Sequence, residues 1–310
     1  MQSNLSNNSN TNLINPKKKN PFNILIPTQK TIPYFLLFPI VLIFLVFMVY
    51  PIIDSLILSF QQYKYGVYTF IGLNNYKRLL IDPVFKTALT NNLIYLVIQV
   101  PIMIGLALIL ADLLNNKFLK GKTFFRISFF MPAVTALVAY SLVFKLLLNS
   151  DYGFINYMLA ALHLPTVDWL NRAISSKASI ILSMTWRWTG YNIVILLAGL
   201  QGISEEIYEA CSIDGANAFQ KFWRITLPLM KPIILFCIIT STIGTLQLFD
   251  ESYILTGGGP NNSTITIAHY LYNTSFRFIN FGYASAMSYI LVLIIAIFSL
   301  IQFKLVGGDD

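Results

Sequence analysis

The side chains best suited to binding a polar ligand lie around Arg187, in an otherwise apolar stretch. This arginine stands between Trp186 and Trp188, with Tyr191 and Asn192 about one helical turn further on. Aromatic faces pack against the CH patches of a sugar, and guanidinium and amide groups donate hydrogen bonds to its hydroxyls. An ionisable residue inside an apolar span is costly, which makes it a candidate for function. We therefore expect Arg187, Tyr191 and Asn192 to border a substrate pathway.

Three further polar residues, Gln247, Asp250 and Tyr253, follow a later apolar stretch and could line the same cavity. Structural explanations stay open beside this functional one. Arg187 could extend its charged group to the membrane surface or pair with Asp250. The two tryptophans that flank it could belong to the aromatic belt of a membrane interface.

No group of residues in the sequence predicts catalysis, a metal site or a cofactor. The two histidines are far apart, and Cys211 and Cys237 form no spacing motif. The tripeptide 121–123, Gly-Lys-Thr, ends like a P-loop, but Asn116 occupies the position of the required glycine. We expect no catalytic residue and no ATP-binding site in this chain.

The composition predicts an integral membrane protein. Of the 310 residues, 56% are hydrophobic and 11% are charged, and the mean hydropathy is +0.65. A soluble domain carries roughly 25% charged residues, so this chain has too few to solvate a globular surface. The net charge of +8 fits the Lys and Arg that membrane proteins collect in cytoplasmic loops, so it does not predict nucleic-acid binding.

Six apolar stretches are long enough to predict transmembrane helices. The expected spans cover residues 33–56, 93–113, 127–148, 180–200, 232–249 and 284–303. Pro39 and Pro51 predict kinks in the first span, and Pro101 lies inside the second. Such prolines are tolerated where neighbouring helices satisfy the freed carbonyls. The predicted fold class is all-α integral membrane with six transmembrane helices.

Six spans place both termini on one side of the membrane. If that side is the cytoplasm, twelve Lys and Arg residues lie there and seven lie outside, which favours this orientation. We expect residues 1–30 to be a disordered cytoplasmic tail, because the first 20 residues contain seven asparagines and cannot bury a core. Residues 31–304 would form the six-span domain, with a polar loop at 203–231, and residues 305–310 a cytoplasmic C-terminal tail.

A polar insert, EACSIDGANAFQKFWRITLP at residues 209–228, separates the fourth and fifth apolar stretches. Ser204 predicts the N-cap of a helix, and Gly215 predicts its end, since glycine readily takes the left-handed C′ conformation. Asn217 predicts the N-cap of a second helix. The insert therefore predicts a helix–turn–helix elbow at the membrane surface, although an interfacial amphipathic loop without a partner would show the same periodicity.

The second helix of the elbow carries an apolar stripe formed by Phe219, Phe222 and Trp223. We expect the helix to stop at Leu227, because the residue before Pro228 is pushed out of the α region.

The spacing within the elbow resembles the EAA motif of binding-protein-dependent ABC transporter permeases. Six positions agree with that motif in order and distance: Glu209, Ala210, Gly215, Ile225, Leu227 and Pro228. Cys211 stands where a second alanine is usual, which exchanges one small apolar residue for another.

Further segments, in the same order along the chain, resemble the carbohydrate-uptake permeases of this family, such as the maltose and lactose system inner-membrane subunits. They are Phe70–Tyr76 with Asp82–Phe85, Phe125-Arg126 with Phe130–Pro132, Leu197–Gln201, Phe249-Asp250 and Leu255–Pro260. Together they cover roughly residues 33–303, nearly all of the chain outside the tails.

The resemblance implies a type I (MetI-like) permease core in the bacterial inner membrane, with a cytoplasmic EAA coupling helix. It implies four kinds of partner: a second homologous permease subunit, an ABC ATPase dimer that hydrolyses ATP, an extracytoplasmic solute-binding protein, and a sugar-like substrate moved by alternating access. The elbow would contact the ATPase through Glu209, with Ala210 and Gly215 permitting close approach. Phe219, Phe222 and Trp223 could instead hold the elbow against its own spans.

Other functions stay open. A glycerol-3-phosphate or other polyol-phosphate permease would resemble a sugar permease closely, and Arg187 would suit a phosphate. A secondary transporter is disfavoured because no inverted repeat or paired acidic residues are evident. An integral-membrane enzyme is disfavoured because acidic residues and histidines are scattered instead of clustered near an interface.

Overall fold

The computed structural model describes residues 32–64, 66–116 and 119–307. The chain divides into two compact units, Met1–Asp54 and Ser55–Asp310. The predicted disordered tail, residues 1–30, lies outside the described residues, as do residues 308–310 of the predicted C-terminal tail.

The described part of the first unit, residues 32–54, is helical, and the helix widens into a π turn ahead of a proline. Its elements are α1 (Ile32–Phe44), the π-helical turn η2 (Leu45–Val49) and the first part of α2 (Tyr50–Ser59). In η2 the Tyr50 N–H donates to the Leu45 carbonyl, five residues earlier. Proline lacks an N–H and its ring clashes with the carbonyl four residues before it, so the wider turn accommodates Pro51. Pro39, the other predicted kink, lies inside α1.

The second unit is a helical bundle preceded by a short hairpin. Its first elements are the end of α2, β1 (Gln61–Lys64), β2 (Val67–Phe70), α3 (Asn74–Ile81), α4 (Pro83–Asn115), α5 (Lys122–Val134), α6 (Leu137–Leu147) and α7 (Phe154–Ala161). They are followed by α8 (Ala173–Gln201), α9 (Glu205–Ile213), α10 (Ala218–Lys221), η3 (Phe222–Thr226), α11 (Leu227–Leu229), α12 (Lys231–Leu246), η4 (Glu251–Leu255), α13 (Ile267–Tyr272), η5 (Asn273–Arg277) and α14 (Phe281–Gly307).

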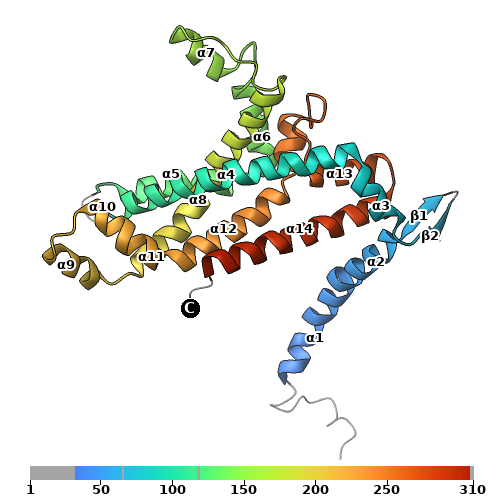
Figure 1. The fold of residues 1–310 in the computed structure, drawn as a ribbon, viewed down its shortest axis with the longest axis horizontal. Helices are drawn as coiled ribbons and strands as arrows, with labels where there is room; N and C mark the ends of the chain where they lie inside the picture. The colour runs from blue at the N-terminus through green and yellow to red at the C-terminus, as the bar shows by residue number, and fades with distance from the viewer. Residues whose placement is uncertain (1–31, 65, 117–118, 308–310) are drawn as a thin grey trace, which may run out of the picture. The chain divides into compact units, whose positions relative to one another are not determined.

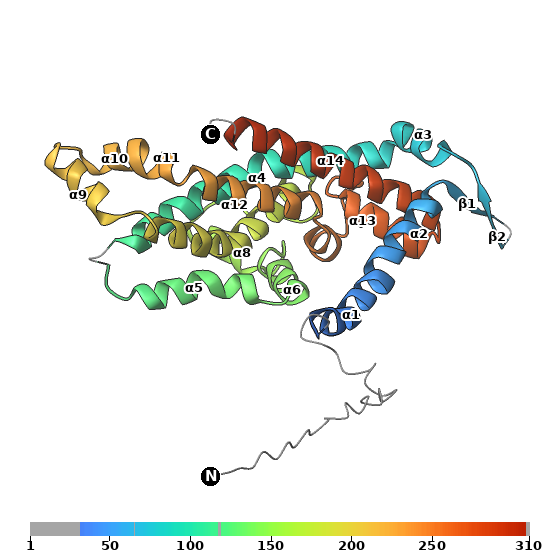
Figure 2. The same cartoon turned by 90° about the horizontal axis from the view of Figure 1, so that it is seen from below.

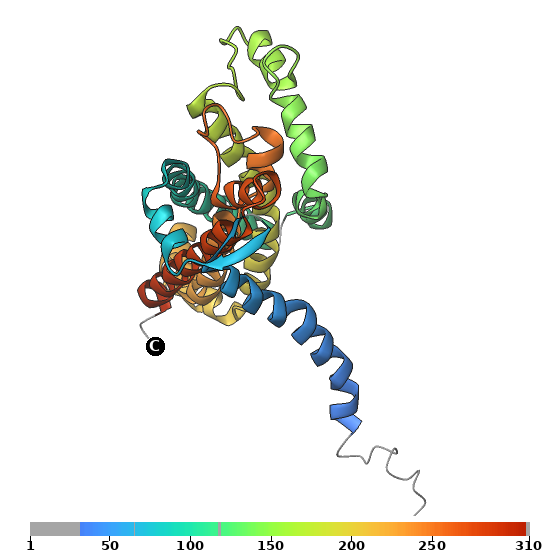
Figure 3. The same ribbon diagram turned by 90° about the vertical axis from the view of Figure 1, so that its right-hand side faces the viewer.

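The long helices α4, α8, α12 and α14 run side by side (Figure 1). The short helices α9 and α10 lie at one end of this bundle, and α3 and α13 lie at the other (Figure 2). The segment of α6 and α7, green in Figure 3, projects away from the bundle.

Within the described residues, four helices are long and apolar enough to cross a membrane, and six crossings result if each of two bent pairs counts as one span. The four are Ile32–Ser59, Pro83–Asn115, Ala173–Gln201 and Phe281–Leu305. The bent pairs are Lys122–Val134 with Leu137–Leu147, and Ala218–Leu229 with Lys231–Leu246. The six predicted spans all have a counterpart, and the fold is the all-α membrane class.

The third predicted span, residues 127–148, is not one straight helix, because α5 and α6 meet at 99°. The Thr135 hydroxyl donates to the Met131 carbonyl at 3.0 Å, which is the acceptor that a continuing helix would offer to the Thr135 N–H. That N–H bonds instead to the Pro132 carbonyl, and Thr135 takes an extended conformation. Sequence analysis missed this break because a helix pattern counts the apolar residues on both sides as one run.

The hairpin is the one departure from all-α structure among the described residues. Strands β1 and β2 are antiparallel, with Gln61 opposite Phe70, and the Tyr63 and Tyr68 rings pack across them at 4.9 Å. The side-chain amide of Asn75 donates to the Gln61 carbonyl at 2.9 Å, which fastens the hairpin to α3.

Helix α4 forms the centre of the core. Its buried side chains recur every three or four residues from Phe85 to Leu114, so one face of this helix is turned into the protein along its length. On α8 the residue Gly190 lets the α5 backbone touch, because a Cβ atom there would lie 1.7 Å from the Phe129 carbonyl oxygen.

Asn92, fully buried on α4, joins the end of α12 to the start of α13. Its side-chain amide donates to the carbonyls of Thr245 and Leu246 at 3.2 and 2.9 Å. Its carbonyl oxygen accepts from the Ile267 N–H at 3.0 Å. The last carbonyls of a helix have no partner within the helix, so Asn92 provides partners that α12 itself cannot.

Asp82 caps α4 and ties it to α13 and α14. One carboxylate oxygen accepts from the N–H groups of Val84 and Phe85 at 2.8 and 3.2 Å, and the other accepts from the hydroxyls of Tyr270 and Tyr283 at 2.7 and 2.6 Å. Burial alone would raise the pKa of Asp82. These hydrogen bonds favour the charged form more strongly, and the pKa lies below its usual range.

We predict that Asp82→Asn destabilises the second unit by about 2 kcal/mol, because hydrogen bonds to a charged acceptor are replaced by weaker ones and the amide turns a donor toward donors. The midpoint of thermal unfolding in detergent, followed by scanning fluorimetry, measures the change. Asp151→Asn, at an exposed position, is the matched control and should leave the midpoint unchanged.

The pH dependence checks the cause of that loss. Since the pKa of Asp82 is lowered in the folded state, its stabilisation is complete above the unfolded-state pKa of about 3.9 and disappears as the pH falls through the folded-state value. Wild-type protein should therefore lose more stability on acidification below about pH 5 than Asp82→Asn does. Equal losses in the two proteins would contradict the assigned role of the carboxylate.

Candidate functional site

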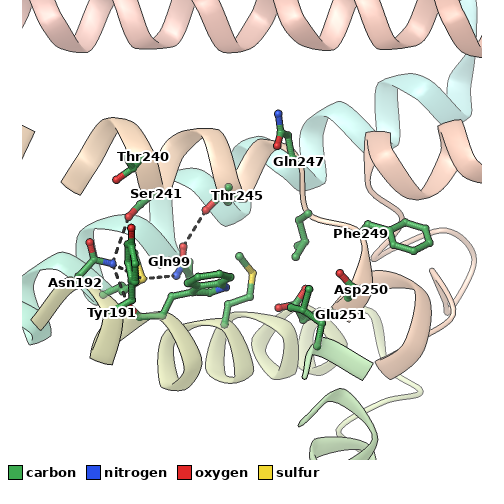
Figure 4. A pocket seen from close by; sticks show the side chains of 16 residues that line it. Gln99, Tyr191, Asn192, Thr240, Ser241, Thr245, Gln247, Phe249, Asp250 and Glu251 are labelled. Carbon is green, nitrogen blue, oxygen red and sulfur yellow. Dashed lines mark hydrogen bonds between the residues drawn. The ribbon is translucent and has the colours of Figure 1, made fainter. Parts of the chain in front are cut away.

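A cavity of about 420 Å³ lies among α4, α8, α12 and the segment that follows α12. This volume lies within the range of small-molecule sites, roughly 300–1,000 Å³. Its walls combine apolar and aromatic groups, such as Met184 and Trp188, with amide, hydroxyl and carboxylate groups. Figure 4 shows that the polar side chains come from several elements, with Asn192, Ser241, Gln99 and Thr245 toward one end, Asp250 and Glu251 at the other, and Gln247 apart from both groups.

At one end of the cavity, amide and hydroxyl groups from three helices meet. Gln99 of α4 accepts from the Thr245 hydroxyl at 3.2 Å. Asn192 of α8 donates to the Trp188 carbonyl at 3.1 Å and to the Ser241 hydroxyl of α12 at 3.5 Å (Figure 4). The side-chain carbonyl oxygen of Asn192 is buried and has no partner among the described residues. This end therefore offers both hydrogen-bond donors and acceptors to a hydroxylated ligand.

At the other end lie two adjacent carboxylates, Asp250 and Glu251. Glu251 is buried, at 2% exposed, and accepts a hydrogen bond from the hydroxyl of Tyr140 on α6. Among the described residues that line the cavity there is no Lys, Arg or His. The cavity therefore has acidic groups without a basic counterpart on its surface.

Four of the six predicted pathway residues line this cavity: Tyr191, Asn192, Gln247 and Asp250. Arg187 is not among the lining residues. It is buried at 5% exposed, its Nη2 donates to the Ala133 carbonyl at 3.3 Å, and its guanidinium lies 4.5 Å from the centre of the Tyr140 ring.

Of the two structural alternatives for Arg187, extension to the membrane surface does not match this position, whereas Asp250 attracts the guanidinium electrostatically without a hydrogen bond. Its Nε and Nη1 have no hydrogen-bond partner among the described residues, so no hydrogen bond to Asp250 is formed. The neighbouring Tyr140 and Trp188 rings, at 4.5 and 5.2 Å, also hold the cation by cation–π contact.

Tyr253 lies outside the lining and belongs to an aromatic cluster around η4. Its ring stacks on Phe249 at 5.1 Å, and its hydroxyl accepts from Arg277 at 3.4 Å. His269 packs edge-on at 5.2 Å and shares a hydrogen bond of 2.8 Å with Ser252. Burial, and secondarily the charge of Arg277, lowers the pKa of His269 to about 4, so this ring is neutral at physiological pH.

Sequence analysis missed several lining residues, among them Gln99, Thr240, Ser241, Thr245 and Glu251. For all of these except Glu251, the available signal was an uncharged polar group within an apolar span, because such groups seek partners inside the bundle. The sequence could not show which of them would face one another, since that depends on the crossing of α4, α8 and α12.

The predicted elbow is present, with its turn at Gly215. Helix α9 ends there with Gly215 at φ +78°, the left-handed conformation that glycine tolerates. The Ala216 N–H donates to the Cys211 carbonyl at 2.9 Å and the Gly215 N–H to the Ser212 carbonyl at 3.2 Å, which is a Schellman arrangement. Ser204 occupies the N-cap position of α9, but its hydroxyl makes no capping bond.

The second arm of the elbow begins as predicted and ends later than predicted. Asn217 caps α10 in a capping box with Gln220. The expected stop at Leu227 is wrong, because the chain stays helical through α11, at Leu227–Leu229. The π-helical turn η3 explains the difference: the Leu227 N–H bonds to the Phe222 carbonyl, and the widened turn leaves room for the Pro228 ring.

The six residues that match the EAA spacing divide into exposed and packed positions. Four of them are exposed and therefore accessible to another molecule: Glu209, Ala210, Gly215 and Pro228. Ile225 is partly buried, and Leu227 packs against the main core. Of the apolar stripe, Phe222 packs on the core, whereas Phe219 and Trp223 are exposed and contact each other at 5.9 Å.

Comparison with known proteins gives the chain a family and relatives. Residues 104–306 match the family described as binding-protein-dependent transport system inner membrane component. The chain is 48% identical over 257 residues to the lactose transport system permease protein LacF of Rhizobium radiobacter, which covers 81% of this chain and 86% of that protein. It is 39% identical over 238 residues to the multiple sugar-binding transport system permease protein MsmF of Streptococcus mutans, at 77% and 81% coverage.

Solved structures share the fold. A chain of a bacterial alginate ABC transporter, crystallised in complex with an alginate pentasaccharide-bound periplasmic protein, superposes with a TM-score of 0.78. The alignment covers 88% of this chain and 93% of that chain at 22% sequence identity, so this likeness concerns the fold alone.

We predict that the end of the cavity with the amide and hydroxyl groups is open to water-soluble ligands. In a background with Cys211 and Cys237 changed to serine, Ser241→Cys should react with a hydrophilic thiol reagent on the order of tenfold faster than Ser183→Cys, because only exposed thiolates react readily. Ser183 is fully buried and does not line the cavity. Equal rates, measured by mass spectrometry, would mean that the cavity is closed to solvent.

Proposed function

This chain belongs to the family of binding-protein-dependent transport system inner membrane components, and on that premise we propose that it is the membrane-spanning permease subunit of an ATP-driven ABC importer for a sugar or sugar-like solute. The observation that carries the proposal is the cavity with hydroxyl and amide groups at one end, in a chain whose relatives are named as sugar permeases. The secondary transporter and the membrane enzyme lose their support with the family assignment.

The charge of the cavity favours a neutral sugar over a phosphorylated solute. Asp250 lines it, whereas Arg187, the residue that would suit a phosphate, is buried behind aromatic rings. Like charges repel each other, so a phosphate group close to the carboxylate of Asp250 is disfavoured. The glycerol-3-phosphate alternative is therefore not favoured.

The elbow would couple this chain to an ATPase. We infer that the exposed Glu209 makes a charged contact with an ABC ATPase dimer, and that Ala210 and Gly215 allow that surface to approach closely. Movement of the elbow would then shift α8 and α12 as rigid elements and alternate the access of the cavity. This subunit itself would hydrolyse no ATP.

The remaining parts of the assembly follow from the same proposal. A second homologous permease would complete the transmembrane pathway, and an extracytoplasmic solute-binding protein would deliver the sugar. Both termini would lie in the cytoplasm of a bacterium, on the same side as the elbow. The numbers of basic residues on the two sides support this orientation.

We predict that Glu209→Lys leaves membrane insertion intact and lowers ATP-dependent sugar uptake on the order of tenfold, because the loss of one buried charged contact costs about 1.4 kcal/mol or more. Uptake by proteoliposomes that contain the complete transporter measures the effect. Asp151→Lys reverses an exposed charge far from the elbow along the chain and should transport at the wild-type rate. Wild-type uptake by Glu209→Lys would count decisively against the coupling role.

We also predict that the reconstituted wild-type transporter carries neutral di- and trisaccharides at least about tenfold faster than glycerol 3-phosphate at equal concentration, because the cavity wall repels a phosphate. Radiolabelled uptake across such a panel, together with binding to the cognate solute-binding protein, measures the preference. Faster uptake of the phosphorylated solute would overturn the assignment of the substrate class.

A further inference from the structure

The first arm of the elbow has little hold on the body of the protein. No side chain of α9 is buried. The helix is joined to α8 by a three-residue link, 202–204, and to α10 by a turn at Gly215. Chain links of this kind transmit little of a displacement, so side-chain contacts of α9 must carry it to the rest of the protein.

Side-chain hydrogen bonds join α9 to the following arm. Lys221 donates to the Ser212 hydroxyl at 2.5 Å near the turn, in an exposed setting. The Tyr208 hydroxyl bonds to the Thr226 hydroxyl at 2.9 Å, and Thr226 is only 2% exposed. The second bond therefore reaches from the surface helix to a buried position.

Thr226 stands where the elbow joins the fifth span. It is the last residue of η3, and its carbonyl accepts from the N–H of Met230 at 2.9 Å. Met230 directly precedes the first residue of α12, Lys231. Met230 is fully buried and packs against Gly199 of α8, where an added Cβ would lie 3.0 Å from the Met230 Cε atom. Tyr208 is thus one hydrogen bond away from the packed junction of α8 and α12.

We propose that the hydrogen bond between Tyr208 and Thr226 is the link through which a displacement of α9 reaches α12 and α8. The inference rests on the proposed function, since it assumes that a partner ATPase moves the elbow. Tyr208 and Thr226 are positioning residues: neither lines the cavity, and they act by making α9 move together with the helices that do.

The test compares variants that remove one hydroxyl and keep the shape of the side chain. Tyr208→Phe and Thr226→Val are examined in the complete transporter in proteoliposomes, with sugar uptake and ATP hydrolysis measured on the same preparation. Each should lower the sugar transported per ATP hydrolysed by about threefold or more, with the ATPase still bound and active. A residue of merely structural importance would lower both rates together and leave their ratio unchanged.

Three further variants sharpen the result. The double variant should be no worse than either single one, because both remove the same bond. Thr226→Ser keeps the hydroxyl and should retain the wild-type ratio. Ser212→Ala removes the exposed bond to Lys221 and is the matched control that should also retain it.

The outcomes separate the two levels of inference. A wild-type ratio in both Tyr208→Phe and Thr226→Val, or losses that multiply in the double variant, would overturn the proposed link while leaving the importer function untouched. If the wild-type chain itself shows no uptake that depends on the ATPase, the proposed function fails, and this link fails with it.

Discussion

Wherever a membrane helix breaks inside a protein, the freed backbone N–H and C=O groups must find partners there, and the second unit is arranged around this requirement. Helix α12 can end at Leu246 because the side-chain amide of Asn92 on α4 donates to its last two carbonyls. The side-chain oxygen of Asn92 also accepts from the N–H of Ile267. The chain can therefore leave its helical path within the packed core. The segment released in this way, residues 247–251, forms one wall of the cavity. The buried amide of Asn92 thus allows α12 to end inside the protein and the cavity to form beside that end.

The two π-helical turns that precede prolines also keep backbone groups hydrogen-bonded, but they do so without ending the helix. Before Pro51 and before Pro228 the helix takes in one extra residue per turn, so that a proline is carried without a break. At Pro228 this keeps the second arm of the elbow helical up to the start of α12. The proline therefore lies inside the helical arm, and the 68° bend toward α12 falls after it, between Leu229 and Lys231.

The sequence predicted the features that local rules decide. Gly215 had to end a helix because only a residue free to take positive φ fits that turn, and Asn217 had to begin the next because its side chain can receive a free N–H. The position of Arg187 depends on partners far along the chain, the Tyr140 ring and the Ala133 carbonyl, which no local pattern identifies. The same holds for Gln99, whose place in the cavity is set by α12 crossing α4.

The contact at Gly190 bears on how the parts of this protein can travel. There the α8 backbone meets the Phe129 carbonyl of α5 with no side chain between them, so the two helices are in direct backbone contact. Sliding along that line would drive atoms into hard repulsion, whereas side-chain contacts elsewhere can yield by changing rotamer. Helices α5 and α8 should therefore turn as a single part. A displacement of α8 would therefore carry α5 with it.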